Sequence, residues 1–147
     1  MLTRTSTDGI LADMIATGGI FDPAATWVGI GSALVDNGVN TVTANLTEDT
    51  TNYPRQPITA WGTPRVLIDG SAVVDSGLHH FVPPDNVHPT LIVVFGLFSA
   101  LTAGLLKEFV LVTPPIGLTV TTDQWSLVVR LRVNPAGEWD VSVSWDG

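Results

Sequence analysis

The sequence predicts a mainly β protein, an antiparallel β-sandwich that is jelly-roll-like and carries a short N-terminal helix. Hydrophobic residues fill 45% of the 147 positions and charged residues only 14%, which is enough apolar surface for a packed core. From residue 26 onward, short segments rich in Val, Ile, Thr and aromatic residues alternate with turn residues. No helical segment separates them, which disfavours a parallel sheet and favours two antiparallel sheets.

The one helical pattern covers residues 7–19. Thr7 or Asp8 can cap its start, and Gly18-Gly19 can end it. A helix of about three turns is marginal on its own, so its apolar stripe is expected to dock on the protein's own sheet or on a neighbouring chain. The stripe consists of Ile10, Leu11, Met14 and Ile15.

Eight segments are predicted as strands of one domain. They are residues 26–35, 55–61, 65–75, 78–82, 91–100, 105–112, 125–133 and 138–145. We therefore divide the chain into an N-terminal helical arm, residues 1–25, and a single β-sandwich domain, residues 26–147. The stretch 36–52 is polar and too long for an ordinary hairpin. It is predicted to be a surface excursion and a candidate contact element.

Two turns predict hairpins. Asp69-Gly70 lies between two apolar runs and is typical of a two-residue hairpin, whose central positions both need positive φ. The segment 134–137 has the sequence Asn-Pro-Ala-Gly, which suits a type I turn followed by a left-handed glycine bulge. Closing that turn matches apolar with apolar and opposite charges with each other. The expected pairs are Val133 with Trp139, Arg132 with Asp140, and Leu131 with Val141.

Charge and length argue against nucleic acid and membrane partners. Six basic and fourteen acidic residues give a net charge of −8, which repels phosphate backbones and anionic lipids. The uncharged run 91–106 has sixteen residues, fewer than the roughly 20 that a spanning helix needs. It contains Thr102-Ala-Gly104, which reads as a turn. We predict two buried strands in this run.

No motif in the sequence indicates catalysis or a cofactor. There is no cysteine, no G-x-S-x-G nucleophile turn and no glycine-rich phosphate loop. His79 and His80 project to opposite faces of a predicted strand, and His88 lies in a loop, which disfavours a shared metal. Gly29 and Gly31 are taken as a bulge or a site of close backbone packing. We predict no enzyme, no cofactor and no metal, and Glu48-Asp49 as a solvated pair.

Tryptophan placement adds one candidate contact residue. Four tryptophans follow apolar strand faces and are predicted to pack in the core. These are Trp27, Trp125, Trp139 and Trp145. Trp61 instead precedes Gly62 at a strand end, where an indole covers a sheet rim or a partner. The candidate interface residues are therefore Ile10, Leu11, Met14, Ile15 and Trp61.

Several short segments in a fixed order resemble a group of small bacteriophage virion proteins. The matching segments are TWVGIGSALV (residues 26–35), Leu46-Thr-Glu48, Tyr53-Pro-Arg-Gln56, Ile58-Thr-Ala-Trp61, Asp69-Gly-Ser71, Phe81-Val-Pro83, the apolar strand around Phe95-Gly96, and Leu105-Leu106. The resemblance covers residues 27–133. Proteins that look like this are β-sandwich components of phage particles, among them head decoration (cement) proteins that bind the outer capsid, often as trimers.

The resemblance implies a non-enzymatic homotrimer that binds the major capsid protein. It would occupy the capsid surface of the virion and the host cytoplasm before assembly, without nucleic acid or membrane partners. Two alternatives stay open. One is a tail or baseplate-associated virion protein of the same fold. The other is a carbohydrate-binding module or carboxylate-pair hydrolase, with Trp61 and acidic loop residues lining a groove.

Overall fold

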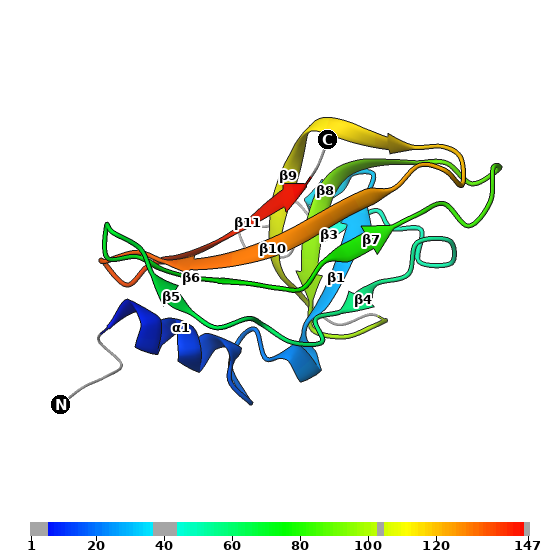
Figure 1. Ribbon diagram of the computed structural model, residues 1–147. Coiled ribbons are helices and arrows are strands. Elements are labelled where there is room, and N and C mark those ends of the chain that lie inside the picture. Colours follow the sequence, from blue (N-terminus) through cyan, green and yellow to red (C-terminus); the bar gives the residue numbers. More distant parts are fainter. Residues whose placement is uncertain (1–5, 37–43, 103–104, 146–147) are drawn as a thin grey trace.

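The computed structural model describes residues 6–36, 44–102 and 105–145. Within them the chain forms two antiparallel sheets and one short α-helix (Figure 1), so the mainly β prediction is confirmed. The elements are α1 (Thr7–Ile15), a 3₁₀ turn (Pro23–Ala25), β1 (Trp27–Gly31), β2 (Leu34–Asp36), β3 (Ala44–Leu46), β4 (Gln56–Pro57), β5 (Arg65–Val66), β6 (Ala72–Asp75), β7 (His79–Phe81), β8 (Thr90–Phe98), β9 (Leu106–Leu118), β10 (Trp125–Val133) and β11 (Trp139–Trp145).

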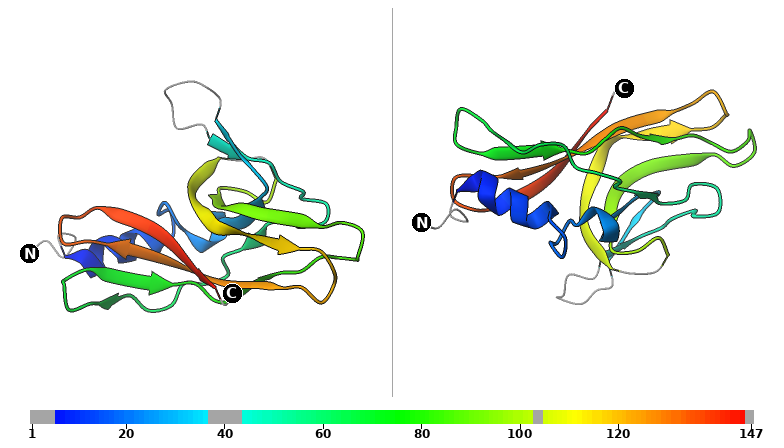
Figure 2. Two further views of the ribbon diagram at one scale, coloured as in Figure 1. Left: turned by 90° about the horizontal axis from the view of Figure 1, so that it is seen from above. Right: turned by 60° about the horizontal axis from the view of Figure 1, so that its bottom comes forward.

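The strands divide into two sheets that share a core. The first, called the β1 sheet, has the order β4-β1-β8-β9. The second, called the β10 sheet, has the order β11-β10-β6-β5, and β7 also pairs with β10. Strands β2 and β3 pair only with each other. Figure 2 shows these two short strands standing apart from the two sheets.

The core lies between the inner faces of the two sheets. Along β10 every second residue is buried, from Trp125 to Val133, as expected for a strand with one covered face. From the opposite sheet, Val28, Phe95 and Leu97 join the same cluster. The face predicted for β11 is confirmed for Val141, Val143 and Trp145, which pack against this core while Ser142 and Ser144 are exposed. The core position predicted for Trp139 is wrong, because its side chain is 37% exposed at the end of the hairpin, with its ring edge-to-face on Phe21.

Helix α1 packs against the β10 sheet of its own chain, with Leu11 and Met14 buried. It lies beneath the hairpins of that sheet (Figure 1), where the Thr7 hydroxyl donates to the Gly70 carbonyl oxygen at 2.7 Å. The helix ends at Ile15, earlier than predicted, because the chain turns sharply there. A Cβ on Gly19 would lie 2.3 Å from the Asp13 carbonyl oxygen, so only glycine fits this close return.

The register predicted for the last hairpin is confirmed. Val133 pairs with Trp139 and Leu131 with Val141, and the Gly137 amide donates to the Asn134 carbonyl oxygen at 2.8 Å. Gly137 has a φ of 84°, as a left-handed bulge position requires.

The two-residue turn predicted at Asp69-Gly70 is wrong by one residue. The Leu67 amide donates to the Ser71 carbonyl oxygen, and the Gly70 amide donates to that of Leu67. Three residues therefore form the loop, with Gly70 at a φ of 87° and Ile68 fully exposed. The Asp69 carboxylate accepts from the Ser71 amide at 2.9 Å, which stabilises this longer turn.

Two other strand predictions changed in detail. The run 91–106 does form parts of two strands, β8 and β9, although residues 103–104 of its predicted turn lie outside the described residues. The predicted strand 26–35 is divided into β1 and β2, and part of the predicted excursion 36–52 is strand β3. Over the part of the chain that the structure describes, no helix is long and apolar enough to span a membrane.

Candidate functional site

The outer face of the β1 sheet, turned away from the β10 sheet, carries a row of glycines. Gly29 of β1 pairs with Gly96 of β8, and Gly31 follows two residues later. A Cβ on Gly31 would lie 2.9 Å from the Leu46 Cβ, and a Cβ on Gly96 would lie 2.8 Å from the Leu46 Cδ1. The glycines therefore let Leu46 of β3 pack directly on the sheet backbone, and the predicted close packing at Gly29 and Gly31 is confirmed.

A second, smaller core forms on these glycines. Leu46, Val94 and Phe98 are its buried members. Four half-buried side chains pack around them: Trp27, Leu34, Leu106 and Phe109. Since Leu34 and Leu46 come from β2 and β3, this core fastens that hairpin to the outer face of the β1 sheet.

A buried ion pair closes the small core. The Arg55 Nε donates to Glu48 Oε1 at 3.0 Å and its Nη2 donates to Oε2 at 2.8 Å, a bidentate arrangement. The two side chains are only 6% and 10% exposed. Arg55 Nη1 also donates to the Ala100 carbonyl oxygen at 2.7 Å, and the guanidinium lies 3.6 Å from the centroid of the Phe98 ring. We call Glu48, Arg55 and Phe98 the clamp.

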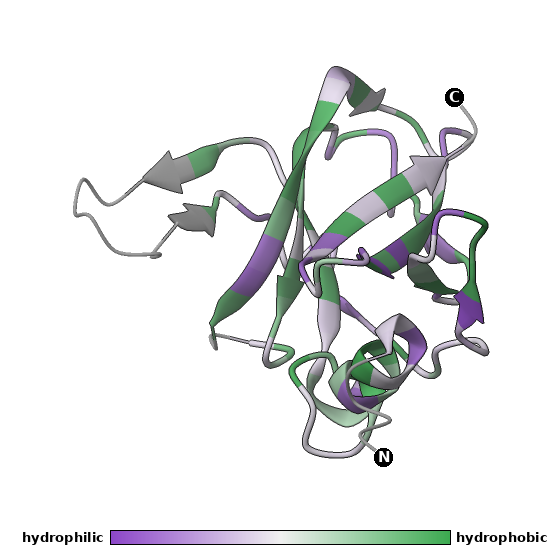
Figure 3. Ribbon diagram, turned by 90° about the vertical axis from the view of Figure 1, so that its left-hand side faces the viewer, coloured by the Kyte–Doolittle hydropathy of each residue, from purple (hydrophilic) through white to green (hydrophobic). Residues whose placement is uncertain are grey.

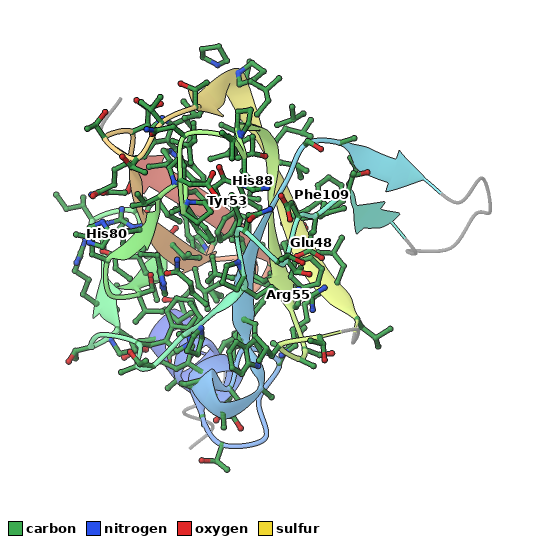
Figure 4. All side chains as sticks on the ribbon, turned by 90° about the vertical axis from the view of Figure 1, so that its right-hand side faces the viewer. Glu48, Tyr53, Arg55, His80, His88 and Phe109 are labelled. Carbon is green, nitrogen blue, oxygen red and sulfur yellow. The ribbon has the colours of Figure 1, made fainter. Side chains whose placement is uncertain are left out.

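The clamp shows that the expectation for Glu48 was wrong, and it gives a packing role to several segments that carry the resemblance. Glu48 is not a solvated loop carboxylate, because Arg55 and the small core cover it. Four of the segments that carry the resemblance come together at the clamp. Leu46-Thr-Glu48 and Tyr53-Pro-Arg-Gln56 supply the ion pair. TWVGIGSALV and Phe95-Gly96 supply Gly29 and Gly96, which lie under the clamp and Leu46. Figure 4 shows Glu48 and Arg55 side by side. The residues of these segments therefore serve in packing, and together they position the base of the β2–β3 hairpin.

Two side chains near Arg55, those of Tyr53 and Gln56, connect the clamp region to other parts of the chain. The Tyr53 hydroxyl donates to the His88 carbonyl oxygen at 2.5 Å, and burial raises the pKa of that hydroxyl. The Gln56 side-chain amide donates to the His80 carbonyl oxygen. The first bond reaches the segment that links β7 to β8, and the second reaches β7 itself, so the clamp region is tied to two neighbouring parts of the chain.

The five predicted contact residues lie in different surroundings. Leu11 and Met14 are buried inside the single chain, whereas Ile10 and Ile15 are half-buried at the edge of the core. Trp61 donates its Nε1 proton to the Phe21 carbonyl oxygen at 2.8 Å and packs against the core. In this conformation Leu11 and Met14 offer no surface to a partner, and Trp61 fastens the segment that follows α1. A role in contacting a partner stays a prediction.

Lys107 is a second fastening point, which sequence reasoning missed. Its Nζ donates to the carbonyl oxygens of Ile20 at 2.7 Å and Ala25 at 2.6 Å, and lies 3.2 Å from the Thr26 hydroxyl oxygen. Burial lowers the pKa of this ammonium group. Lys107 therefore joins the N-terminal arm to β9, across more than eighty residues of sequence.

The predicted separation of the histidines is confirmed. His79 is buried in the inner face of β7, and burial lowers the pKa of its imidazole. His80 is exposed on the outer face, and His88 pairs with Asp85 in the loop at 2.8 Å. Figure 4 shows His80 on a different flank from the clamp. Among the described residues, no group of three or more His, Asp or Glu side chains is placed to hold a metal ion.

Arginines and carboxylates pair across the outer face of the β10 sheet. Arg130 makes a bidentate bond to Asp75, at 2.7 and 3.0 Å, and Arg132 reaches Asp69 at 2.6 Å. The hydrogen bond from Arg130 holds the pKa of Asp75 below its usual value. These pairs partly neutralise the arginines on this face.

Comparisons of this chain with known proteins found no matching protein family, no matching curated protein and no matching solved structure.

Proposed function

We propose that this chain is a non-enzymatic structural protein of a bacteriophage particle, and that it binds the outer surface of the capsid as a decoration protein. The observation that supports this best is the clamp. Its buried ion pair, together with three close-packed glycines, holds the base of the β2–β3 hairpin against the sheet. The chain segments that lead to that hairpin leave the body of the sheet in Figure 3. A hairpin whose base is anchored in this way suits contact with a neighbouring subunit.

Exposed leucines extend the small core onto the surface. Leu111 of β9 pairs with Val94, a member of the small core, and is 57% exposed. Leu105, next to Leu106 of the same core, is 74% exposed, and Leu101 is exposed in the same β8–β9 connection. All three leucines lie on β9 or on the connection before it, and exposed apolar side chains that border a core suit a contact surface. We assign Leu101, Leu105 and Leu111 to the contact with the capsid.

A decoration protein needs no active site. On a particle the same contact repeats many times, and an oligomer that engages several capsid subunits gains affinity through multivalency. The net charge of −8 keeps such a protein away from the packaged nucleic acid. We therefore retain the homotrimer and the major capsid protein as the proposed assembly and partner.

Binding to purified phage shells that lack the protein tests this proposal. The chain is mixed with shells, the shells are sedimented, and the bound fraction is measured. The wild-type chain is expected to saturate the shells, and Leu111→Ser is expected to weaken binding about tenfold, the effect of losing one buried leucine contact. Leu91→Ser, at another exposed leucine of the β1 sheet, is the matched control and should bind normally.

Three results would contradict the proposal. The first is no binding of the wild-type chain to shells. The second is equal binding by the Leu111 and Leu91 variants, which would remove the assigned surface. The third is binding along tails only, which would favour the tail or baseplate alternative. Light scattering tests the trimer separately, and a mass of 15.6 kDa at every concentration would contradict it.

A further inference from the structure

A mixed polar and apolar pocket opens on the outer face of the β10 sheet, whereas the clamp lies on the β1 sheet. Its volume is about 420 Å³, within the range on the order of 300–1,000 Å³ typical of small-molecule sites. The lining residues are Leu78, His80, Gln124, Ser126, Val128, Ser144 and Trp145. They come from β7, β10 and β11 and from the short segments before β7 and β10, so strands of one sheet build most of the wall.

Three of the polar residues already form a network. His80 and Ser126 face each other across the β7–β10 pair, and the His80 Nδ1 lies 2.7 Å from the Ser126 Oγ. The Gln124 Nε2 donates to the His80 Nδ1 at 2.9 Å and to the Ser126 Oγ at 2.5 Å. Strand pairing and these bonds hold the groups in place before a ligand arrives, which lowers the entropic cost of binding.

The network leaves hydrogen-bonding capacity unused. When Gln124 donates to the His80 Nδ1, the imidazole carries its proton on Nε2, which is then a donor. Within the described residues, the His80 Nε2, the Gln124 Oε1 and the Ser144 hydroxyl have no protein partner. The pocket wall therefore combines a donor, an acceptor and a hydroxyl that can do both.

The chemistry of the wall selects the ligand class. Among the described residues, no Asp, Glu, Lys or Arg lines the pocket, so these residues offer a charged ligand no opposite charge, and the net charge of −8 opposes anions. Hydroxyl groups, which donate and accept, match the amide, imidazole and hydroxyl groups of the wall. Leu78 and Val128 add apolar surface, suited to the C–H face of a ring. Trp145 only borders the pocket, because its ring packs against the buried Trp125.

The arrangement does not favour nucleophilic catalysis by Ser126. The single acceptor position of the His80 Nδ1 is shared between the Ser126 hydroxyl and the Gln124 amide, so it is not reserved for the Ser126 proton. Within the described part of the chain, His80 has no carboxylate partner to orient its ring. The network suits ligand binding.

We propose that this pocket binds a neutral sugar ring, one pyranose unit of a glycan, through Gln124, His80, Ser126 and Ser144 with Trp145 at its border. The site is separate from the residue Trp61 that sequence reasoning had assigned to a sugar groove. It does not depend on the capsid proposal, because it uses a different sheet and different residues. A particle protein with such a site would add contact with surface glycans to its structural role.

Titration of the ¹⁵N-labelled chain with single sugars tests the proposal. The probes are glucose, galactose, mannose, rhamnose and N-acetylglucosamine, with glucose 6-phosphate as the charged comparison. At least one neutral sugar is expected to shift the Gln124 side-chain amide and the Trp145 indole signals saturably, with a millimolar dissociation constant, as for a small ligand in an open site.

Two variants make the result decisive. Gln124→Ala is expected to weaken binding about tenfold, since one hydrogen-bonding side chain is lost. Ser142→Ala removes an exposed hydroxyl from the same strand, two residues from Ser144 and outside the pocket, and should leave binding unchanged. The spectra themselves show whether each variant is folded.

Four outcomes would overturn the proposal. One is the absence of shifts with every neutral sugar. Another is equal affinity of the wild type and Gln124→Ala. A third is shifts confined to signals such as the Trp61 indole, outside the pocket. The last is tighter binding of glucose 6-phosphate than of glucose, which would contradict the neutral ligand class.

Discussion

Replacing Arg55 by alanine is expected to destabilise the protein far more than replacing an arginine on the surface. The substitution removes both bonds to Glu48, the bond to the Ala100 carbonyl oxygen and the contact with the Phe98 ring. It leaves the Glu48 carboxylate, 10% exposed, without its partner. Loss of one partner of a buried ion pair costs about 3–5 kcal/mol of unfolding free energy.

The pair Arg130–Asp75 supplies a matched control within the same chain. It is also bidentate, at 2.7 and 3.0 Å, but its side chains are 39% and 30% exposed. Water screens such a pair, so Arg130→Ala is expected to cost about 0–1 kcal/mol. The two substitutions thus remove the same chemical group from a bidentate pair, and the sites differ in burial and in the further contacts of Arg55 with Ala100 and Phe98.

Urea unfolding followed by tryptophan fluorescence measures the difference. With a slope of about 1.5 kcal/mol per molar urea, a loss of about 3 kcal/mol lowers the midpoint by about 2 M, and the Arg130 variant should shift it by less than about 0.7 M. Equal midpoints for the two variants would refute the argument from burial. A double variant, Arg55→Met with Glu48→Leu, should regain most of the stability, because no buried charge is left alone.

Three further predictions follow from the packing. Gly96→Ala places a Cβ 2.8 Å from Leu46 and Leu106 side-chain atoms and should cost about 1–3 kcal/mol in urea unfolding, whereas Gly117→Ala, with nothing within 4 Å, should cost little; a harmless Gly96→Ala would contradict the close packing. Lys107→Met removes the bonds to Ile20 and Ala25 and should speed amide hydrogen exchange in residues 7–25 while β10 keeps its protection; unchanged exchange in the arm would show that Lys107 does not hold it. The folded-state pKa of His79 lies below its ordinary value of 6.5, so the unfolded chain binds the extra proton first as pH falls. Unfolding free energy should therefore be level above about pH 6.5 and fall below it, by at most about 1.4 kcal/mol per pH unit for one proton. His79→Leu should flatten this part of the curve, and the same slope in the variant would assign it to another group.

Local patterns in the sequence were sufficient for the β10–β11 hairpin. Its alternation places one face in the core, and a one-residue slip would turn every side chain over, so the turn at 134–137 and the pattern specify the same register. The Asp69-Gly70 turn shows the limit of this reasoning. A dipeptide alone does not distinguish a two-residue loop from a three-residue loop, and the bond from the Ser71 amide to the Asp69 side chain favours the longer one.

The clamp could not be predicted from local sequence. Glu48 lies in a polar stretch, and its burial depends on Phe98 and on the Arg55 bond to Ala100, which lies 45 residues from Arg55 in sequence. Trp61 was identified as unusual, but its partner is the Phe21 carbonyl, 40 residues away. Long-range contacts of this kind leave no periodic signal. The glycines did leave one, because Gly29 and Gly31 interrupt an otherwise apolar strand.

The most direct test of the account is the composition of purified phage particles that encode this chain, measured by quantitative mass spectrometry. The proposed role predicts the chain in intact particles at a fixed ratio to the major capsid protein, and a lower ratio in particles that carry the Leu111→Ser substitution. A chain found only in the soluble fraction of infected cells, and absent from particles, would contradict a structural role in the virion.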